Sequence, residues 1–130
     1  MDARTLHEAM PFAALLGAEV VAATPGEVVL QLTWRPDLCT AGGVLHGGAL
    51  MALADATGGV CAFLNLPEGA TGTTTIESKT NFLRAVRAGH VTATARPLHA
   101  GRRTIVVDTE LRDDEARLVA RTTQTQAVLE

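Results

Sequence analysis

The chain has no tyrosine, and aromatic residues make up only 3% of its 130 residues. A core without large rings has to be built from alanine, valine, leucine and isoleucine, whose small side chains let a helix pack closely on a sheet. The apolar fraction of 47% excludes an intrinsically disordered chain. A chain of this length is expected to form one domain spanning residues 1–130, with about two thirds of its unfolded surface buried.

Basic residues other than arginine are almost absent, since Lys79 is the single lysine beside ten arginines. With a net charge of −3, the chain offers no broad basic surface for nucleic acid, and we expect no such partner. The planar guanidinium fork binds phosphate oxygens well, so the bias towards arginine favours an anionic ligand. A genome-wide preference for arginine explains the same bias equally well.

Only two cysteines are present, Cys39 and Cys61, and they form neither a CxxC pair nor a disulfide framework. A reduced, cytoplasmic location is therefore expected. The first thirty residues lack the basic and apolar regions of a signal peptide. The longest apolar stretch, residues 49–64, is shorter than a typical membrane span and contains Asp55. We expect a buried helix there, and no membrane partner.

Common metal-binding and hydrolase motifs are also missing. The four histidines show no HExxH or other paired-ligand spacing: His7, His46, His90 and His99. The GxSxG nucleophile motif does not occur, and neither cysteine has companions arranged as in papain. We therefore expect no metal and no cofactor.

The hydrophobic pattern predicts an α+β domain. Residues 3–16 read as a short amphipathic helix with a break at Pro11, and a hairpin and a long apolar helix follow. Three or four meandering strands then continue to the end of the chain. The expected elements are strands 18–23 and 27–35, a loop 36–45, a helix from 47 or 48 to 65, and strands 71–83, 90–97, 104–112 and 118–128. An antiparallel sheet needs cover on its apolar face, so we expect it to wrap around the one long central helix.

Residues 45–55 carry the chemistry that the sequence suggests. Gly47 and Gly48 begin the long helix, where backbone N–H groups are free and the helix dipole is positive. Asp55 follows about two turns later, alone in an apolar run, and its i+3 and i+4 neighbours are glycines that leave room beside it. Each feature has a plain alternative: glycines are common at helix ends, Asp55 could contact a loop, and His46 could cap the helix.

Taken together, the residues LHGGALMALADA (45–56) resemble the helix motif of the hot-dog superfamily thioesterases, in the phenylacetate-degradation and 4-hydroxybenzoyl-CoA branches. The similarity extends to residues 81–89 and 96–103, and covers the chain from about residue 12. The resemblance implies a hot-dog fold and hydrolysis of an acyl-CoA thioester with an aryl or medium-chain acyl group, without a cofactor. It also implies a homo-oligomer, either a dimer or a dimer of dimers.

The resemblance assigns roles to particular residues. Gly47 would donate its N–H to the thioester oxygen, and Asp55 would act as a general base on water or as a nucleophile through an anhydride. His46 would shape the site rather than act as the base, and Thr75 would place a hydroxyl on the facing strand. Thr40 stands six residues before His46, where relatives often carry asparagine or glutamine, so the contact made by that amide is in question. The site is expected between two protomers, with Asp55 of one chain facing Gly47 of another.

Coenzyme A also carries phosphates that need partners. Four arginines at expected strand ends and turns are candidates for these contacts: Arg84, Arg87, Arg102 and Arg103. For any one of them, a solvated turn charge is the more common explanation. Two other functions remain open at this point, a non-catalytic acyl-CoA sensor of the same fold and a hydratase or dehydratase, although the spacing of His46 and Asp55 fits thioesterases better.

Overall fold

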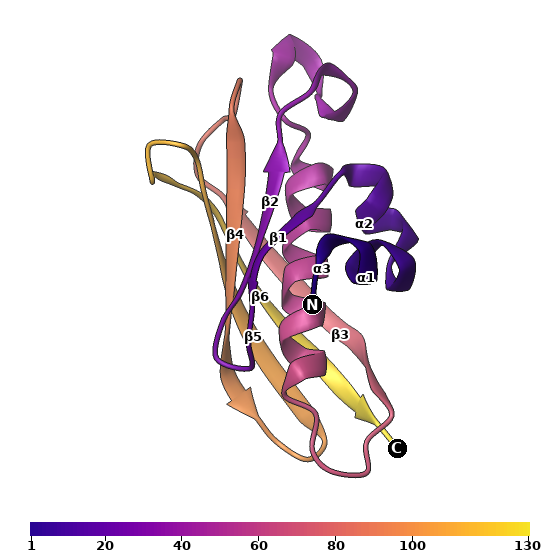
Figure 1. Ribbon diagram of the computed structural model, residues 1–130. Coiled ribbons are helices and arrows are strands. Elements are labelled where there is room, and N and C mark those ends of the chain that lie inside the picture. Colours follow the sequence, from indigo (N-terminus) through magenta and orange to yellow (C-terminus); the bar gives the residue numbers. More distant parts are fainter.

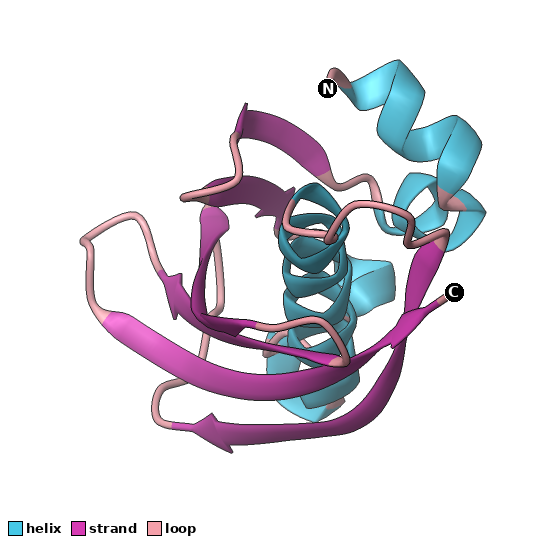
Figure 2. Cartoon of the chain, turned by 90° about the horizontal axis from the view of Figure 1, so that it is seen from below, coloured by secondary structure: helices cyan, strands magenta, loops and turns pink.

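The computed structural model describes residues 1–130, and it folds as a curved antiparallel sheet around one long helix (Figures 1 and 2). The six strands lie in the order β1-β2-β4-β5-β6-β3. The helices are α1 (Ala3–Ala9), α2 (Pro11–Leu16) and α3 (Gly47–Leu64), and the strands are β1 (Glu19–Ala23), β2 (Val28–Thr33), β3 (Gly72–Phe82), β4 (His90–Ala100), β5 (Thr104–Arg112) and β6 (Leu118–Leu129). The expected sheet wrapped around a central helix is confirmed.

The concave face of the sheet packs on α3, as Figure 2 shows looking along the helix. The alternation expected in β2 and β5 is observed, because Leu30 and Leu32 are fully buried and so are Ile105 and Val107. Ala54 of α3 is also fully buried, which brings the helix close to the sheet. The core is thus built from aliphatic residues, as the scarcity of aromatics predicts.

The length argument against a membrane span in α3 was wrong. This helix has 18 residues and a mean hydropathy of 1.4, so its length and composition alone would allow it to cross a membrane. Half of it is buried inside the fold, and the core helix of a protein without membrane spans passes the same test. The role of α3 as the centre of the fold therefore follows from its packing and not from its length.

Of the three or four meandering strands expected, three are observed. Strands β4, β5 and β6 do follow one another in the sheet, but β3 pairs with β6 and forms the edge opposite β1. The last part of β4 was also missed, because the strand continues past Pro97 to Ala100. Proline is tolerated there since β2 pairs with β4 only as far as Ala95, which leaves an open edge beside Pro97. The predicted loop 36–45 contains two short 3-10 turns, Pro36–Leu38 and Ala41–Gly43.

Candidate active site

The N-terminus of α3 presents one backbone donor without a partner. The first four N–H groups of an α-helix have no partner inside the helix. Here the N–H of Gly48 donates to His46 Nδ1 at 2.8 Å, and the N–H groups of Ala49 and Leu50 reach the carbonyl oxygen of His46 at 2.9 and 3.2 Å. Only the N–H of Gly47 is left, at the positive end of the helix dipole, where it can stabilise a developing negative charge.

His46 caps this helix. Its Nδ1 accepts the Gly48 N–H, so the proton of the neutral ring has to sit on Nε2. A ring held in this way can donate a hydrogen bond from Nε2 but has no free lone pair with which to accept a proton. The geometry therefore agrees with a shaping role for His46 and argues against a role as general base.

Phe82, the last residue of β3, packs over Gly47 and was not singled out from the sequence. A Cβ atom on Gly47 would lie 3.2 Å from Phe82 Cζ and 3.3 Å from Cε1, which is tighter than ordinary van der Waals contact. The Phe82 side chain is nevertheless 50% exposed, so its ring borders the free N–H without sealing it. Glycine at position 47 thus keeps open the space between the helix end and this ring.

Asp55 lies on the side of α3 that borders the edge strand β3. The sequence suggested a buried carboxylate, but the Asp55 side chain is exposed in the single chain and borders a pocket of about 480 Å³. The pocket is formed by the N-terminal segment, α3, β3 and β6, and its walls are Met1, Ala9, Met10, Asp55, Gly59, Val60, Phe63, Gly72, Thr73, Thr74, Thr75 and Gln126. The carboxylate therefore stands in a largely apolar recess that a ligand can enter.

Desolvation in this recess raises the pKa of the Asp55 carboxyl, and a hydrogen bond from Thr75 acts in the opposite direction. Thr75 also accepts a hydrogen bond from Gln126, whose Nε2 lies 2.7 Å from Thr75 Oγ1. The expected hydroxyl on the facing strand is thus present beside the acid. Gln126 was not predicted, because it ends a run of six consecutive polar residues, 121–126, in which nothing marks one side chain from the next.

A β-bulge at Ile76 sets which residues of β3 face the site. Thr75 pairs with Gln126 and Glu77 pairs with Thr125, so Ile76 is an extra residue in the ladder. The shift changes the alternation along the strand, and it allows both Thr75 and Phe82 to approach α3 although their numbers differ by an odd interval. A strict period of two along the strand would not place both residues there.

The two glycines after Asp55 differ in their surroundings. Gly59 borders the pocket, and a Cβ atom added to it would meet nothing within 4 Å, which agrees with the expected room beside the acid. Gly58 instead faces the sheet, where an added Cβ would collide with the buried amide of Gln124. The expectation was therefore correct for Gly59 and wrong for Gly58.

Thr40 is not brought to either Asp55 or Gly47 in the single chain. It is exposed at the start of the second 3-10 turn, and its N–H donates to the carbonyl of Val44 at 2.8 Å. It lines no part of the Asp55 pocket. Within one chain, Thr40 therefore does not make the contact that the asparagine or glutamine of relatives would make at the site.

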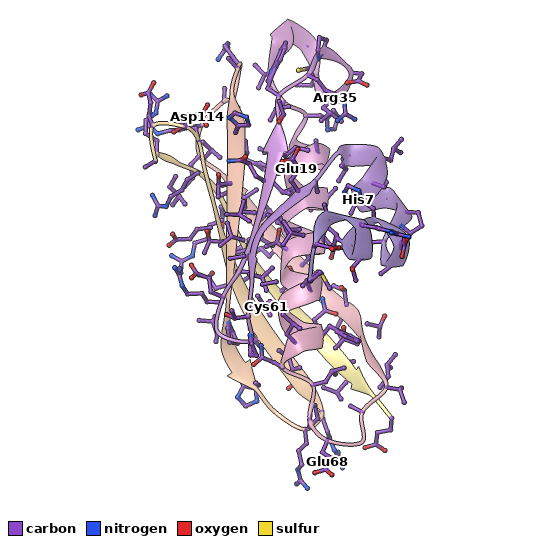
Figure 3. All side chains as sticks on the ribbon, in the orientation of Figure 1. His7, Glu19, Arg35, Cys61, Glu68 and Asp114 are labelled. Carbon is purple, nitrogen blue, oxygen red and sulfur yellow. The ribbon has the colours of Figure 1, made fainter.

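The four candidate arginines fall into two separate pairs. Arg84 and Arg87 lie in the β3–β4 connection, beside the β5–β6 turn that carries Asp114 (Figure 3). Arg102 and Arg103 lie in the β4–β5 turn, with Arg102 beside the loop that contains Glu68 at the opposite end of the sheet (Figure 3). None of the four forms an ion pair, so all remain available to an anion, but one chain does not gather them at one site.

The cysteines and acidic residues do not form a redox or metal centre in the structure. Cys39 and Cys61 are both free thiols. Burial raises the pKa of the Cys61 thiol to about 11, which makes it a poor nucleophile. No three side chains among the histidines, cysteines and acids lie close enough together to hold an ion.

Comparison with known proteins identifies the family. The model of the thioesterase superfamily matches residues 42–120. Rv1847 of Mycobacterium tuberculosis, a predicted esterase, is 34% identical over 118 residues that cover 89% of this chain and 84% of that protein. Its solved structure has a TM-score of 0.90 at 33% identity, covering 93% of this chain and 98% of that chain.

Two further relatives carry more specific names. The structure of thioesterase HI1161 from Haemophilus influenzae has a TM-score of 0.86 at 31% identity and covers 92% of this chain and 82% of that chain. The 1,4-dihydroxy-2-naphthoyl-CoA hydrolase of Escherichia coli is 37% identical over 87 residues, which are 67% of this chain and 63% of that protein. These neighbours confirm the expected hot-dog fold. The chain belongs to the thioesterase superfamily, and its reaction class is thioester hydrolysis.

Proposed function

We propose that this protein hydrolyses acyl-CoA thioesters with the N–H of Gly47 as oxyanion donor and the carboxylate of Asp55 as the reacting acid. Water attacks the carbonyl carbon with Asp55 as the general base, or Asp55 attacks it and water then hydrolyses the resulting anhydride. In either case the C–S bond breaks, and coenzyme A leaves as the thiol with a proton that comes from the water. The observation that carries the proposal is the one unpaired N–H at the positive end of α3, on the same helix as a partly desolvated carboxylate. General-base and nucleophilic roles for Asp55 both fit this arrangement.

The proposed site needs two copies of the chain. Gly47 and Asp55 are eight residues apart on one helix, which corresponds to about 12 Å along its axis. A reacting carbonyl group has to lie about 3 Å from both its oxyanion donor and its attacking group. Asp55 of one protomer is therefore proposed to face Gly47 of its partner, in a homodimer or a dimer of dimers. The exposed apolar side chains of Ile76 and Leu83 on and beside the edge strand β3 support such an assembly.

The substrate is proposed to be an aryl or medium-chain acyl-CoA. The pocket beside Asp55 has apolar walls that include Met10, Val60 and Phe63, and its volume of about 480 Å³ lies in the range of small-molecule sites. The named substrate class of the Escherichia coli relative, an aromatic acyl-CoA, supports the aryl alternative.

For the coenzyme A phosphates we propose Arg84 and Arg87, because they follow β3 at the end of the sheet where Gly47 begins α3. Arg102 and Arg103 are the alternative pair. Replacing the correct pair by alanine should raise KM for acyl-CoA but not for the matching N-acetylcysteamine thioester, which lacks the nucleotide. An unchanged KM for acyl-CoA in the Arg84/Arg87 variant would move the assignment to the other pair. We also propose a cytoplasmic location, because both cysteines are free thiols, as is usual in a reducing compartment.

The decisive experiment measures thiol release from a panel of aryl- and fatty-acyl-CoA thioesters by the wild type and by Asp55→Asn. A matched control is Glu19→Gln, which neutralises an exposed acid on the opposite edge strand, where it forms no ion pair. We expect the Asp55 variant to fold and to lose on the order of 10²–10⁴ in rate, with the control unchanged. Equal turnover by the Asp55 variant would refute the mechanism. Binding of acyl-CoA by calorimetry without turnover would instead establish the sensor alternative.

A further inference from the structure

Gln126 is a buried polar residue next to the proposed acid. Its side chain is only 2% exposed, and β6 presents it towards α3 directly opposite Thr75 on β3. An amide buried in this way is costly unless it forms hydrogen bonds. Its Nε2 donates to Thr75 Oγ1 at 2.7 Å, and Gln126 and Asp55 border the same pocket. The cost of burying the amide is thus offset by a bond to Thr75, which lines the same pocket as Asp55 and whose hydroxyl lowers the pKa of the Asp55 carboxyl.

The direction of these hydrogen bonds follows from the donors available. A threonine hydroxyl has a single proton, and an ionised carboxylate can only accept. Thr75 therefore has to donate its proton to Asp55, which leaves its oxygen lone pairs for the Gln126 amide. This requirement also sets the orientation of the amide, with Nε2 and not Oε1 towards Thr75.

We propose that Gln126 is a positioning residue, whose buried amide fixes the Thr75 hydroxyl so that it holds one carboxylate oxygen of Asp55 and leaves the other free to react. The proposal rests on the role of Asp55 in the proposed function. Successive hydrogen bonds polarise one another, so the donation from Gln126 strengthens the bond from Thr75 to the carboxylate. The relay opposes the effect of desolvation on Asp55 and favours its ionised form. No titratable side chain other than Asp55 lines this pocket, and Asp55 forms no ion pair.

The test compares two glutamines that each bond a threonine. Gln126→Met removes the amide while keeping a side chain of similar length. Gln31→Met is the matched control, because Gln31 Nε2 donates to Thr92 Oγ1 at 3.3 Å between β2 and β4, away from Asp55. For each variant, kcat and KM are measured across the acidic pH range, and the Asp55 carboxyl is titrated by ¹³C NMR, with its signal assigned by Asp55→Asn.

In Gln126→Met we expect the Asp55 titration and the acidic limb of the kcat profile to move together to higher pH. On that limb, kcat should fall about two- to tenfold, which is the effect of losing one neutral hydrogen bond. At pH values above the limb the loss in kcat should be smaller, and KM should be unchanged throughout. Thr75→Val should reproduce the shift, and the double variant should show no further shift, because Gln126 acts only through Thr75. Thr75→Ser, which keeps the hydroxyl, should restore the wild-type profile, and Gln31→Met should not move it.

An Asp55 titration that stays in place in Gln126→Met, or that moves equally in Gln31→Met, would overturn the relay. If Gln126→Met does not fold, Thr75→Val at its exposed position decides the question by the same two measurements. The NMR titration needs no substrate, so it separates this inference from the proposed function. A shifted titration in a protein without thioesterase activity would support the relay and refute the function.

Discussion

The unpaired N–H of Gly47 can be removed without removing the helix that carries it. Gly47 is the first residue of α3, and proline is favoured at this position because its ring already has a helical φ angle and its missing N–H has no helical partner. The preceding residue, His46, has φ −60° and ψ 135°, which is the extended conformation that precedes proline. Gly47→Pro therefore deletes one donor and preserves the helix.

The expected size of the effect follows from the hydrogen-bond inventory at this helix end. The other three early N–H groups, of Gly48, Ala49 and Leu50, are already bonded to His46, so none of them can replace the lost donor. Removal of a single oxyanion donor typically lowers kcat by about 10²–10³-fold. We expect a loss of that order for Gly47→Pro.

Gly47→Ala is the matched control, because it keeps the N–H and introduces the same close approach to Phe82 as the proline ring. Both variants are assayed for thiol release from the best acyl-CoA substrate, and circular dichroism checks that α3 is retained. Gly47→Ala should keep clearly more activity than Gly47→Pro. If the two folded variants are equally active, the N–H of Gly47 is not the oxyanion donor and the proposed mechanism is wrong.

Three further predictions concern stability and reactivity. Gly58→Ala should unfold at lower urea concentration than Gly59→Ala at equal protein concentration. The methyl group at position 58 collides with Gln124 at a cost of about 1–3 kcal/mol, whereas the methyl group at position 59 meets open space and gains about 1 kcal/mol of helix propensity. Equal unfolding midpoints for the two variants would contradict this prediction. Asp55→Asn should be more stable than the wild type at neutral pH, since a raised carboxyl pKa means that ionisation of Asp55 opposes folding above its ordinary range. That advantage should vanish as the pH falls below this range, and urea unfolding at several pH values would show whether it does. Iodoacetamide at about pH 8 should label Cys39 well before Cys61, whose buried thiol has a pKa of about 11, and peptide mass analysis would reveal the opposite order.

The sequence by itself determined the features that depend on neighbouring residues. Alternation over residues 28–32 and 105–111 predicted which side chains β2 and β5 bury, because successive residues of a strand point to opposite faces. The apolar run after Gly47 predicted the central helix, and glycine after His46 marked its start. Capping and the free N–H lie within this one short segment, so the part of the site at the helix end was accessible to sequence reasoning.

The tertiary structure alone decided the features that depend on residues far apart in the chain. Thr75 meets Gln126 only because β3 crosses to the far edge of the sheet and pairs with β6, and the bulge at Ile76 exists only within that pairing. Gly58 and Gly59 look alike in the sequence, yet one faces a buried amide and the other faces the pocket. Local preferences carry no information about such contacts, because strand order and register are set by which apolar faces are buried together across the whole fold.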